Sequence, residues 1–320
     1  MTNRAAADRL TPEAAIDRIE AVIPPRPQDR RLHARGAVYD ARFVPSGQID
    51  NLTIATHLRN ETPAVVRFSN AGGFGADDRT KGVRGMAVKF LADGHAVADL
   101  AAANTLTFPS RTPEGFVALV ELLSKLQSGL VGRLQAVPKL VSILVKHPET
   151  GKALLGGAAK PPTSFAATRF NGLNTFVLVD ADGQRRAFRY RLLPELGEIA
   201  LDDDQARTLP HDFLIAELDQ RLTQGPVVFT LAFQFAEPGD PTADPTIAWP
   251  EQRTILPAGQ IIVTSRLSNE DHWQQQVFDP TRVPAGVELS DDPILAFRAQ
   301  AYAVSAQRRQ EQTKPVSERR

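Results

Sequence analysis

Short apolar runs, each bounded by turn-forming residues, recur along much of the chain. Runs rich in valine and phenylalanine are typical of β-strands when glycine, proline or asparagine closes them. Two such runs, 174–179 and 186–191, flank an Asp-Ala-Asp-Gly turn and predict a β-hairpin. The main predicted strands are 42–44, 64–68, 86–90, 174–179, 186–191, 227–235 and 260–264.

Elsewhere apolar residues recur every three or four positions, which indicates amphipathic helices. The clearest helix begins at Thr112-Pro113-Glu114, which supplies an N-cap, a first-turn proline and an acid at the positive end of the helix dipole. Its pattern continues with breaks to about residue 147. The other predicted helices are 11–22, 211–223 and 292–310. The runs 151–162 and 237–258, rich in Gly, Ala, Pro or Asp, are predicted loops.

The order of these elements predicts the fold class. Strands follow one another without alternating helices, and the helices fall in separate blocks. We therefore expect an α+β protein rather than a parallel α/β sheet. The pattern predicts an antiparallel β-barrel with helical insertions and a C-terminal helix.

Composition excludes several classes of function. The chain has 320 residues, with 37 Lys and Arg against 37 Asp and Glu. Nucleic-acid binding needs a basic excess, so we expect no nucleic-acid partner. The chain has no cysteine. Disulfides, zinc–thiolate sites, iron–sulfur clusters, thiolate haem ligation and thiol nucleophiles are therefore excluded.

Targeting signals are absent from the sequence pattern. Asp8 and Arg9 interrupt the only apolar run near the start, which leaves no signal-peptide core. No stretch approaches the roughly 18 uncharged apolar residues that a membrane-spanning helix needs. We therefore expect a cytoplasmic location and no membrane partner.

The final predicted helix carries the most informative residues. Arg298 and Tyr302 lie four positions apart and share a helix face, to which Arg309 returns. An arginine held beside a phenol oxygen favours the phenolate, which is a good ligand for Fe(III). The same residues also suit a buried tyrosine and two surface arginines on an ordinary amphipathic helix.

Four further segments contain candidate polar chemistry: 30–36, 65–73, 84–90 and 99–105. Each alone is consistent with a strand and a turn, and a lone histidine such as His33 is more often structural than catalytic. Arginine is seldom buried without a partner. Several arginines converging in a barrel would therefore need an anionic ligand.

Together these motifs resemble those of the haem catalase superfamily, most closely its short branch of catalase-related peroxidases. His33-Ala34-Arg35-Gly36 is similar to the family's distal-histidine strand, and 84–90 to its Arg-Gly-(Phe/Met)-Ala-Val-Lys-Phe signature. Arg298-x-x-x-Tyr302 is similar to the proximal haem-tyrosine motif. The resemblance covers 30–310 as one haem domain. An N-terminal helix and lead-in (1–29) precede this domain, and a polar tail (311–320) follows it.

The resemblance implies roles for the matching residues and a haem b cofactor. Tyr302 would be the axial ligand of the haem iron, with Arg298 donating to its oxygen. His33 would be the distal acid–base group, held by Ser69. Asn104 would hydrogen-bond the peroxide.

The resemblance also implies which residues bind the rest of the cofactor. Arg30, Arg67 and Arg309 match the three family arginines that pair with the haem propionates. Phe116 would pack on the haem near its distal side. The propionates would then supply the counter-charge that buried arginines need.

The same resemblance implies an oxidoreductase of the oxidative-stress response, which reduces hydrogen or organic peroxides with a small organic donor. The chain ends eighteen residues after Tyr302. We therefore expect it to lack the C-terminal domain and NADPH pocket of longer catalases, and to have more open haem access. These expectations favour peroxidase activity with weak catalase activity, in a monomer or small homo-oligomer. Two alternatives stay open: an isomerase or dehydratase of fatty-acid hydroperoxides like allene oxide synthase, and a non-enzymatic haem-binding barrel.

Overall fold

A closed antiparallel β-barrel forms the centre of the protein, in a computed structural model that describes residues 9–73, 75–155 and 159–313. In this part of the chain, the barrel strands follow one another in the order β7-β5-β4-β3-β2-β1-β9-β8, and β8 pairs back with β7. The barrel strands are β1 (Gly36–Pro45), β2 (Thr62–Asn70), β3 (Arg84–Ala92), β4 (His95–Ala103), β5 (Phe170–Gly172), β7 (Arg185–Pro194), β8 (Val227–Phe235) and β9 (Ile255–Arg266). The predicted antiparallel barrel is confirmed.

Two short strands extend the sheet beside β7. β6 (Phe176–Val179) pairs with the first half of β7, and β10 (Val287–Leu289) pairs with β6. The β6–β7 pairing confirms the predicted hairpin, with its turn at Asp180–Gly183.

Phenylalanine side chains fill the barrel interior. Phe68 stacks on Phe165 with ring centroids 5.2 Å apart, and Phe170 and Phe229 pack against the same ring at 5.9 Å. All four rings are buried. The barrel interior is therefore a packed core.

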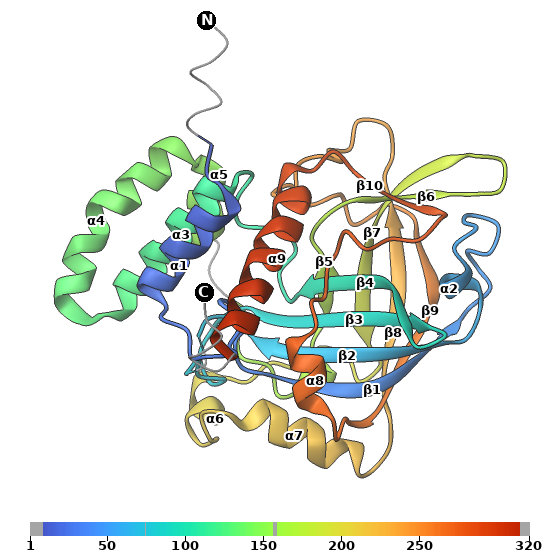
Figure 1. Cartoon of the computed structure of the whole chain (residues 1–320), viewed down its shortest axis with the longest axis horizontal. Helices are drawn as coiled ribbons and strands as arrows, with labels where there is room; N and C mark the ends of the chain where they lie inside the picture. Colours follow the sequence, from blue (N-terminus) through green and yellow to red (C-terminus); the bar gives the residue numbers. More distant parts are fainter. Residues whose placement is uncertain (1–8, 74, 156–158, 314–320) are drawn as a thin grey trace, which may run out of the picture.

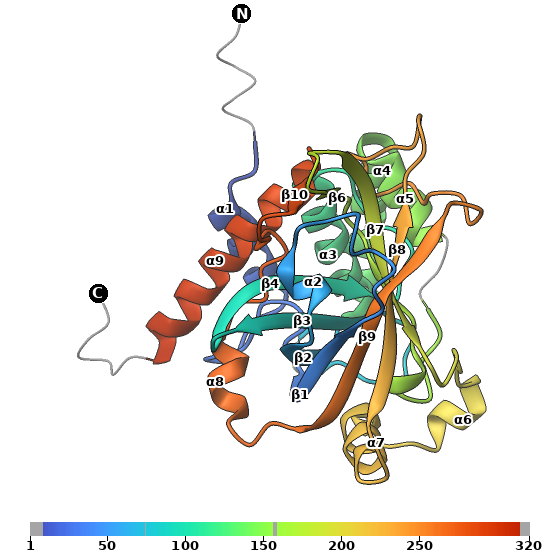
Figure 2. The ribbon, with the colours of Figure 1, turned by 90° about the vertical axis from the view of Figure 1, so that its right-hand side faces the viewer.

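Most helices cover one side of the barrel (Figure 1). α1 (Pro12–Val22), α3 (Pro113–Gln127), α4 (Gly129–Lys146) and α5 (Pro148–Leu155) form a helical layer, and α9 (Pro293–Thr313) runs between this layer and the barrel. Figure 2 shows α9 slanting past the ends of β3 and β4. The remaining helical elements are α2 (Thr56–Arg59), the 3-10 turn Phe165–Ala167, α6 (Asp203–Arg207), α7 (Phe213–Leu222) and α8 (Glu270–Gln275).

The helical block after Thr112 divides into α3 and α4 at Gly129, whose φ of +83° lies in the left-handed region that ends a helix, in agreement with the predicted breaks. Two predicted loops differ from the structure. The predicted loop 237–258 is wrong for 255–258, which belong to β9. The predicted loop 151–162 is wrong for 151–155, which belong to α5. A Cβ on Gly151 would lie 2.6 Å from Leu144 Cδ2, so a larger residue there would require the exposed Leu144 side chain to move.

The N- and C-terminal ends of the chain are described in part. Residues 1–8 of the predicted lead-in and 314–320 of the predicted polar tail lie outside the described residues. α9 continues to Thr313, beyond the predicted end near residue 310. Within the described ranges, no helix is both long enough and apolar enough to cross a membrane.

Candidate active site

The Tyr302 hydroxyl lies under the guanidinium of Arg298, one helical turn earlier on α9. Arg298 Nε and Nη2 donate to Tyr302 Oη at 3.2 and 3.0 Å. Side chains four apart on a helix are neighbours, so α9 itself produces this contact. Two donated hydrogen bonds and a positive charge stabilise negative charge on the phenol oxygen.

Arg298 is held in turn by two residues that the sequence analysis did not single out as site residues. Its Nη1 donates to Asn174 Oδ1 at 2.6 Å, and Asn174 Nδ2 donates to Asp292 Oδ2 at 2.6 Å. Asp292 also caps the start of α9 by accepting from the backbone nitrogen of Ile294 at 2.9 Å. A continuous chain of hydrogen bonds therefore runs from the helix N-terminus to the tyrosine oxygen.

Only the capping role of Asp292 could have been found from sequence, because Asp-Pro at a helix start is a local signal. Asn174 lies 124 positions before Arg298 and reaches it by tertiary folding. Both Asn174 and Asp292 are buried, at 2% exposure each.

Strand register gathers the candidate distal residues at one end of the barrel. Gly36 of β1 pairs with Ser69 of β2, and Ser69 pairs with Gly85 of β3. His33 precedes β1, and Asn104 follows β4, whose last residue Ala103 pairs with Gly85. Residues far apart in sequence thus become neighbours.

His33 is held against this row of residues. Its Nδ1 lies 3.0 Å from Ser69 Oγ, within hydrogen-bond distance. A Cβ on Gly85 would lie 2.9 Å from both His33 Nδ1 and Ser69 Oγ, so only glycine leaves room for the pair. The φ of His33 is +54°, a left-handed conformation that side chains rarely adopt, and such backbone strain is concentrated at functional sites.

The surroundings of His33 keep it neutral. Burial is the main cause that lowers its pKa to about 3, and the positive charges of Arg67, Arg298, Arg30 and Arg84 contribute to the same shift. Part of the side chain remains accessible. Since Ser69 contacts Nδ1, the imidazole Nε2 is the ring nitrogen left for a ligand.

Asn104 is fixed beside the same row by a two-way contact with Arg84. Its Oδ1 accepts from the backbone nitrogen of Arg84 at 2.8 Å, and its own backbone nitrogen donates to the Arg84 carbonyl at 3.0 Å. In the described part of the chain its amide nitrogen makes no hydrogen bond. This donor is therefore available to a ligand.

Arg30, Arg67 and Arg309 form a cationic cluster, in which Arg67 and Arg309 are buried. Their guanidinium groups come together because all three donate to residues 274–276. Burial, followed by the charges of neighbouring arginines, lowers the pKa of each, to about 10 for Arg67 and for Arg309. Arg67 and Arg309 therefore stay protonated at neutral pH.

The hydrogen bonds of this cluster go to neutral groups. Arg30 Nη2 donates to the carbonyls of Gln274 and Gln276, Arg67 Nε donates to Gln274 Oε1, and Arg67 Nη2 donates to the His33 carbonyl. Arg309 donates to Ser305 Oγ and to the Gln275 carbonyl. Among the described residues none of the three has a carboxylate partner. The buried Nε atoms of Arg30 and Arg309 have no acceptor in the part of the chain that the structure describes. The cluster thus lacks an anion.

Phe116, a predicted cofactor contact, lies among apolar side chains of the helical layer rather than beside the barrel strands. It packs with α1 and α3 side chains, and its ring centroid is 5.1 Å from that of Phe108. Phe108, which the sequence analysis did not select, faces the Arg298 guanidinium at 6.0 Å. Phe108 therefore connects Phe116 to the tyrosine side of the site.

A family model described as catalase matches residues 10–313. The chain is 39% identical to a catalase-related peroxidase of Mycolicibacterium paratuberculosis over 94% of this chain and 95% of that protein. It is 29% identical to a catalase-related peroxidase of Synechococcus elongatus over 95% of this chain and 90% of that protein. A solved bacterial catalase structure aligns with a TM-score of 0.77 at 20% identity, over 97% of this chain and 61% of that one. The chain therefore belongs to the catalase family.

Proposed function

We propose that this protein is a haem b peroxidase that reduces hydrogen or organic peroxides with a small organic electron donor, and that it has weak catalase activity. Two relatives that match nearly the whole chain are named catalase-related peroxidases, which supports this assignment. The observation that carries the proposal is the pairing of Tyr302 with Arg298 in a protein that also holds a cationic cluster without an anion.

The residues present fit a haem. Tyr302 would bind the iron through Oη, and Arg298 would donate two hydrogen bonds to that oxygen. Arg30, Arg67 and Arg309 would bind the two propionates. The negative charges of the propionates would neutralise these arginines, which have no carboxylate partner among the described residues. When bound, the haem supplies the oxidation–reduction chemistry, and the chain supplies binding, orientation and proton transfer.

His33 is the proposed acid–base group. In the neutral tautomer with hydrogen on Nδ1, that nitrogen donates to Ser69 Oγ and leaves Nε2 free to take a proton from one peroxide oxygen. The same Nε2–H then returns the proton to the departing oxygen. Bound propionates would offset the charges of Arg30 and Arg67, and would raise the pKa of His33 toward the range of a useful base.

Asn104 and Ser69 orient the reacting groups. The free amide nitrogen of Asn104 would donate to peroxide, since its Oδ1 is already engaged by Arg84. Ser69 fixes the ring of His33, so it is a positioning residue. A barrel that only stored haem would not need this combination of donor, base and orienting hydroxyl.

The test is an absorption spectrum and a turnover assay on the haem-loaded protein. We expect a high-spin ferric spectrum with phenolate character, and oxidation of a phenolic dye that is driven by hydrogen peroxide or an organic hydroperoxide. Bound haem without dye oxidation would favour the haem-binding barrel. Conversion of a fatty-acid hydroperoxide without consumption of dye would favour the isomerase.

A further inference from the structure

α4 exposes a continuous apolar surface, which we call the α4 apolar face. Its residues are between 43% and 75% exposed, and it consists of Leu130, Val131, Leu134, Val137, Val141, Leu144 and Val145. Leu123 and Leu126 at the end of α3 are also exposed, at 39% and 37%. A contiguous exposed patch of large apolar residues marks an interaction surface.

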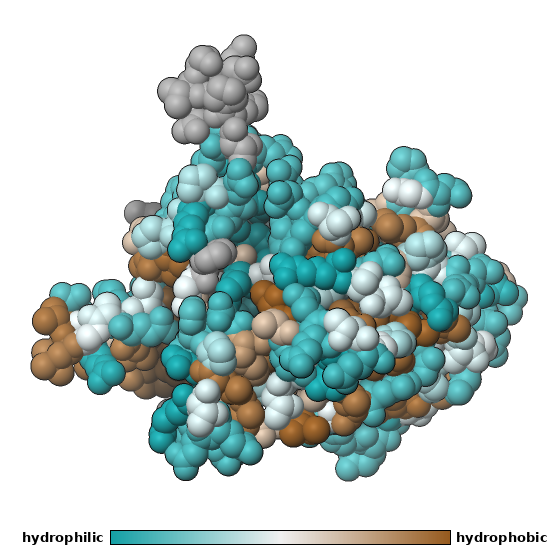
Figure 3. All heavy atoms as spheres, turned by 90° about the horizontal axis from the view of Figure 1, so that it is seen from below, coloured by the Kyte–Doolittle hydropathy of each residue, from teal (hydrophilic) through white to brown (hydrophobic). Residues whose placement is uncertain are grey.

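The helical spacing sets this face opposite the one that packs on the protein. The buried residues Gly132, Ala136 and Ile143 form the inner side of α4, which lies against α3. The exposed residues recur at intervals of three, four and seven, so they share the other side. α4 is the outermost helix of its layer in Figure 1, and Figure 3 shows apolar side chains gathered at the same end of the molecule.

Charge along this region is of one sign. Residues 122–148 contain no Asp or Glu, although they contain Lys125, Arg133, Lys139 and Lys146. Lys139 contacts Glu121. Lys125, Arg133 and Lys146 form no ion pair within the described ranges. Helical spacing sets Arg133 at the edge of the apolar face, whereas Lys125 and Lys146 line a hollow on the opposite side of α4. The segment that carries the face therefore holds only positive charge.

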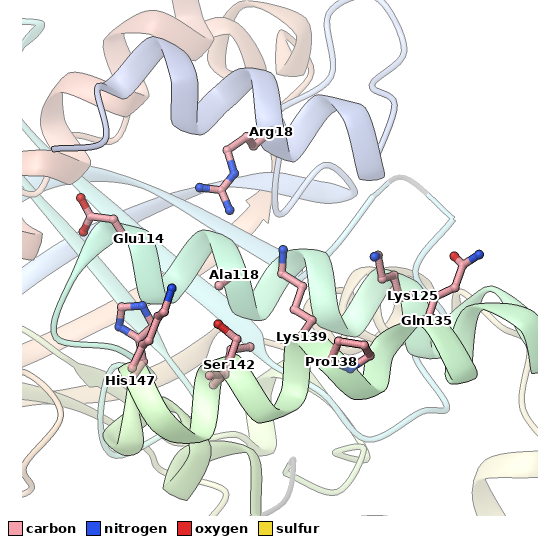
Figure 4. Close-up of a pocket in the computed structure, with 11 residues that line it drawn as sticks. Arg18, Glu114, Ala118, Lys125, Gln135, Pro138, Lys139, Ser142 and His147 are labelled. Atoms are coloured by element: carbon pink, nitrogen blue, oxygen red, sulfur yellow. The ribbon is translucent and has the colours of Figure 1, made fainter. Parts of the chain in front are cut away.

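A hollow of about 910 Å³ lies between α1, α3 and the side of α4 opposite the apolar face. Figure 4 shows Arg18 of α1 and Lys139 of α4 pointing toward one another there, with Lys125 and His147 also on its wall. Arg18 and Lys139 share the single carboxylate of Glu121. The region behind the apolar face is thus also rich in basic groups.

We propose that the α4 apolar face docks on an anionic lipid surface, with α4 lying in the plane of the interface. An apolar side, basic residues elsewhere on the helix and no acid are the features of a helix that binds at such an interface. Arg133 would lie nearest the anionic headgroups, and the apolar face would contact the acyl boundary. The lysines on the hollow side would add an attraction of the same sign at longer range.

A second copy of the chain fits this face less well. Two α4 helices packed through this face would bring the Arg133 side chains of both copies to one interface, with no acid on either helix to form a cross-pair. The sequence-based expectation of no membrane partner considered only segments that cross a bilayer, and a helix lying on a surface needs no such segment. The proposal does not depend on the peroxidase assignment.

The test is co-sedimentation of the full-length, haem-loaded protein with vesicles. We expect binding to mixed phosphatidylcholine–phosphatidylglycerol vesicles, weakening at high salt, and little binding to pure phosphatidylcholine. Equal binding to both vesicles, or none to either, would overturn the proposal.

Variants separate the contributions of apolar and basic residues to vesicle binding. The double change Leu134→Glu and Val141→Glu should lower the partition coefficient by at least about tenfold. The change Arg133→Gln should lower it by about fivefold, the effect of one basic residue near an anionic surface, and should reduce the salt dependence. The matched control, Leu196→Glu and Ile199→Glu, changes two residues of similar exposure in the loop after β7 and should leave binding unchanged.

Light scattering on the same samples tests self-association. A wild type that is dimeric and fails to bind vesicles, and that becomes monomeric on Leu134→Glu and Val141→Glu, would replace the lipid surface with a second copy. Circular dichroism and the haem absorption band check that the variants remain folded.

Discussion

Arg298 donates two hydrogen bonds to the hydroxyl of Tyr302, at 3.2 and 3.0 Å, while a third nitrogen of the same guanidinium binds Asn174. One arginine thus fixes the phenol oxygen and is itself fixed from outside α9. The orientation of the proposed ligand therefore depends on contacts within the helix and on a residue 124 positions away.

Replacing Tyr302 with phenylalanine removes only the proposed ligand oxygen. We expect Tyr302→Phe to lose most of its haem, because no other oxygen of that side chain can bind iron. The haem-to-protein ratio after purification measures the effect. Tyr39→Phe is the matched control, since Tyr39 is a buried tyrosine whose hydroxyl donates to Asp219. A Tyr302→Phe protein with a normal ferric spectrum and full activity would show that Tyr302 is not the ligand.

Asn174→Ala tests the link between α9 and the barrel. The change leaves Arg298 Nη1 and a buried oxygen of Asp292 without partners, which should lower the free energy of unfolding by about 1–3 kcal/mol. It should also shift the haem absorption maximum, because Arg298 would no longer hold Tyr302 in one orientation.

Asn171→Ala controls for the loss of a buried asparagine, since Asn171 donates only to the Thr105 carbonyl. Asn171→Ala should lower the free energy of unfolding without shifting the haem absorption maximum. Identical spectra for Asn174→Ala and the wild type would mean that Asn174 has no influence on the tyrosine.

His33→Gln should retain haem and lower peroxide-dependent turnover by about 10²–10⁴-fold, the usual contribution of a positioned acid–base group. Ser69→Ala should cause a smaller loss, because it removes the group that orients the ring and leaves the ring itself. Stopped-flow measurement of the reaction with peroxide separates this step from donor oxidation. Unchanged turnover in His33→Gln would remove His33 from the mechanism.

The arginine cluster should affect haem binding more than the stability of the haem-free protein. In Arg309→Met the lost hydrogen bonds to Ser305 and Gln275 are offset by relief of repulsion with Arg30 and Arg67. A charged hydrogen bond contributes about 1.5–3 kcal/mol, so haem affinity should fall by roughly 10–100-fold.

Arg31→Met is the control for this change. Arg31 is a buried arginine that already pairs with Glu20, so its loss should destabilise the haem-free protein and leave haem affinity nearly unchanged. Haem titration and thermal unfolding give the two quantities. The reverse pattern, with haem affinity sensitive to Arg31 and insensitive to Arg309, would contradict the assignment.

Buried histidine makes stability depend on pH. Burial lowers the pKa of His57 to about 4, whereas in the unfolded chain the group titrates near 6.5. Between these values the unfolded state binds a proton that the folded state does not, so stability falls as pH decreases from 6.5 toward 4. His57 should contribute about 2–3 kcal/mol to that fall by pH 4.5.

Urea unfolding of the haem-free protein at neutral and acid pH measures this effect. His57→Phe, which keeps an aromatic ring beside Phe90, should be less sensitive to acid than the wild type by that amount. His95→Asn changes an exposed histidine and should behave like the wild type. Equal acid sensitivity of His57→Phe and the wild type would exclude this contribution.

The sequence by itself determined the features that depend on neighbouring residues. The period of apolar positions predicted most helices and the β6–β7 hairpin, and four-residue spacing on a helix was enough to bring Arg298 and Tyr302 together. It failed at 151–155, where a glycine that is unfavourable for a helix alone lies in α5, which packs against α4.

Only the tertiary structure decided the features that join distant segments. The register of β1, β2 and β3 places Ser69 and Gly85 beside His33, because strand pairing joins residues that no local pattern connects. Asn174 reaches Arg298 for the same reason. The convergence of Arg30, Arg67 and Arg309, and the choice of which apolar side of α4 is covered, also depend on packing, because burial is a property of surroundings rather than of sequence spacing.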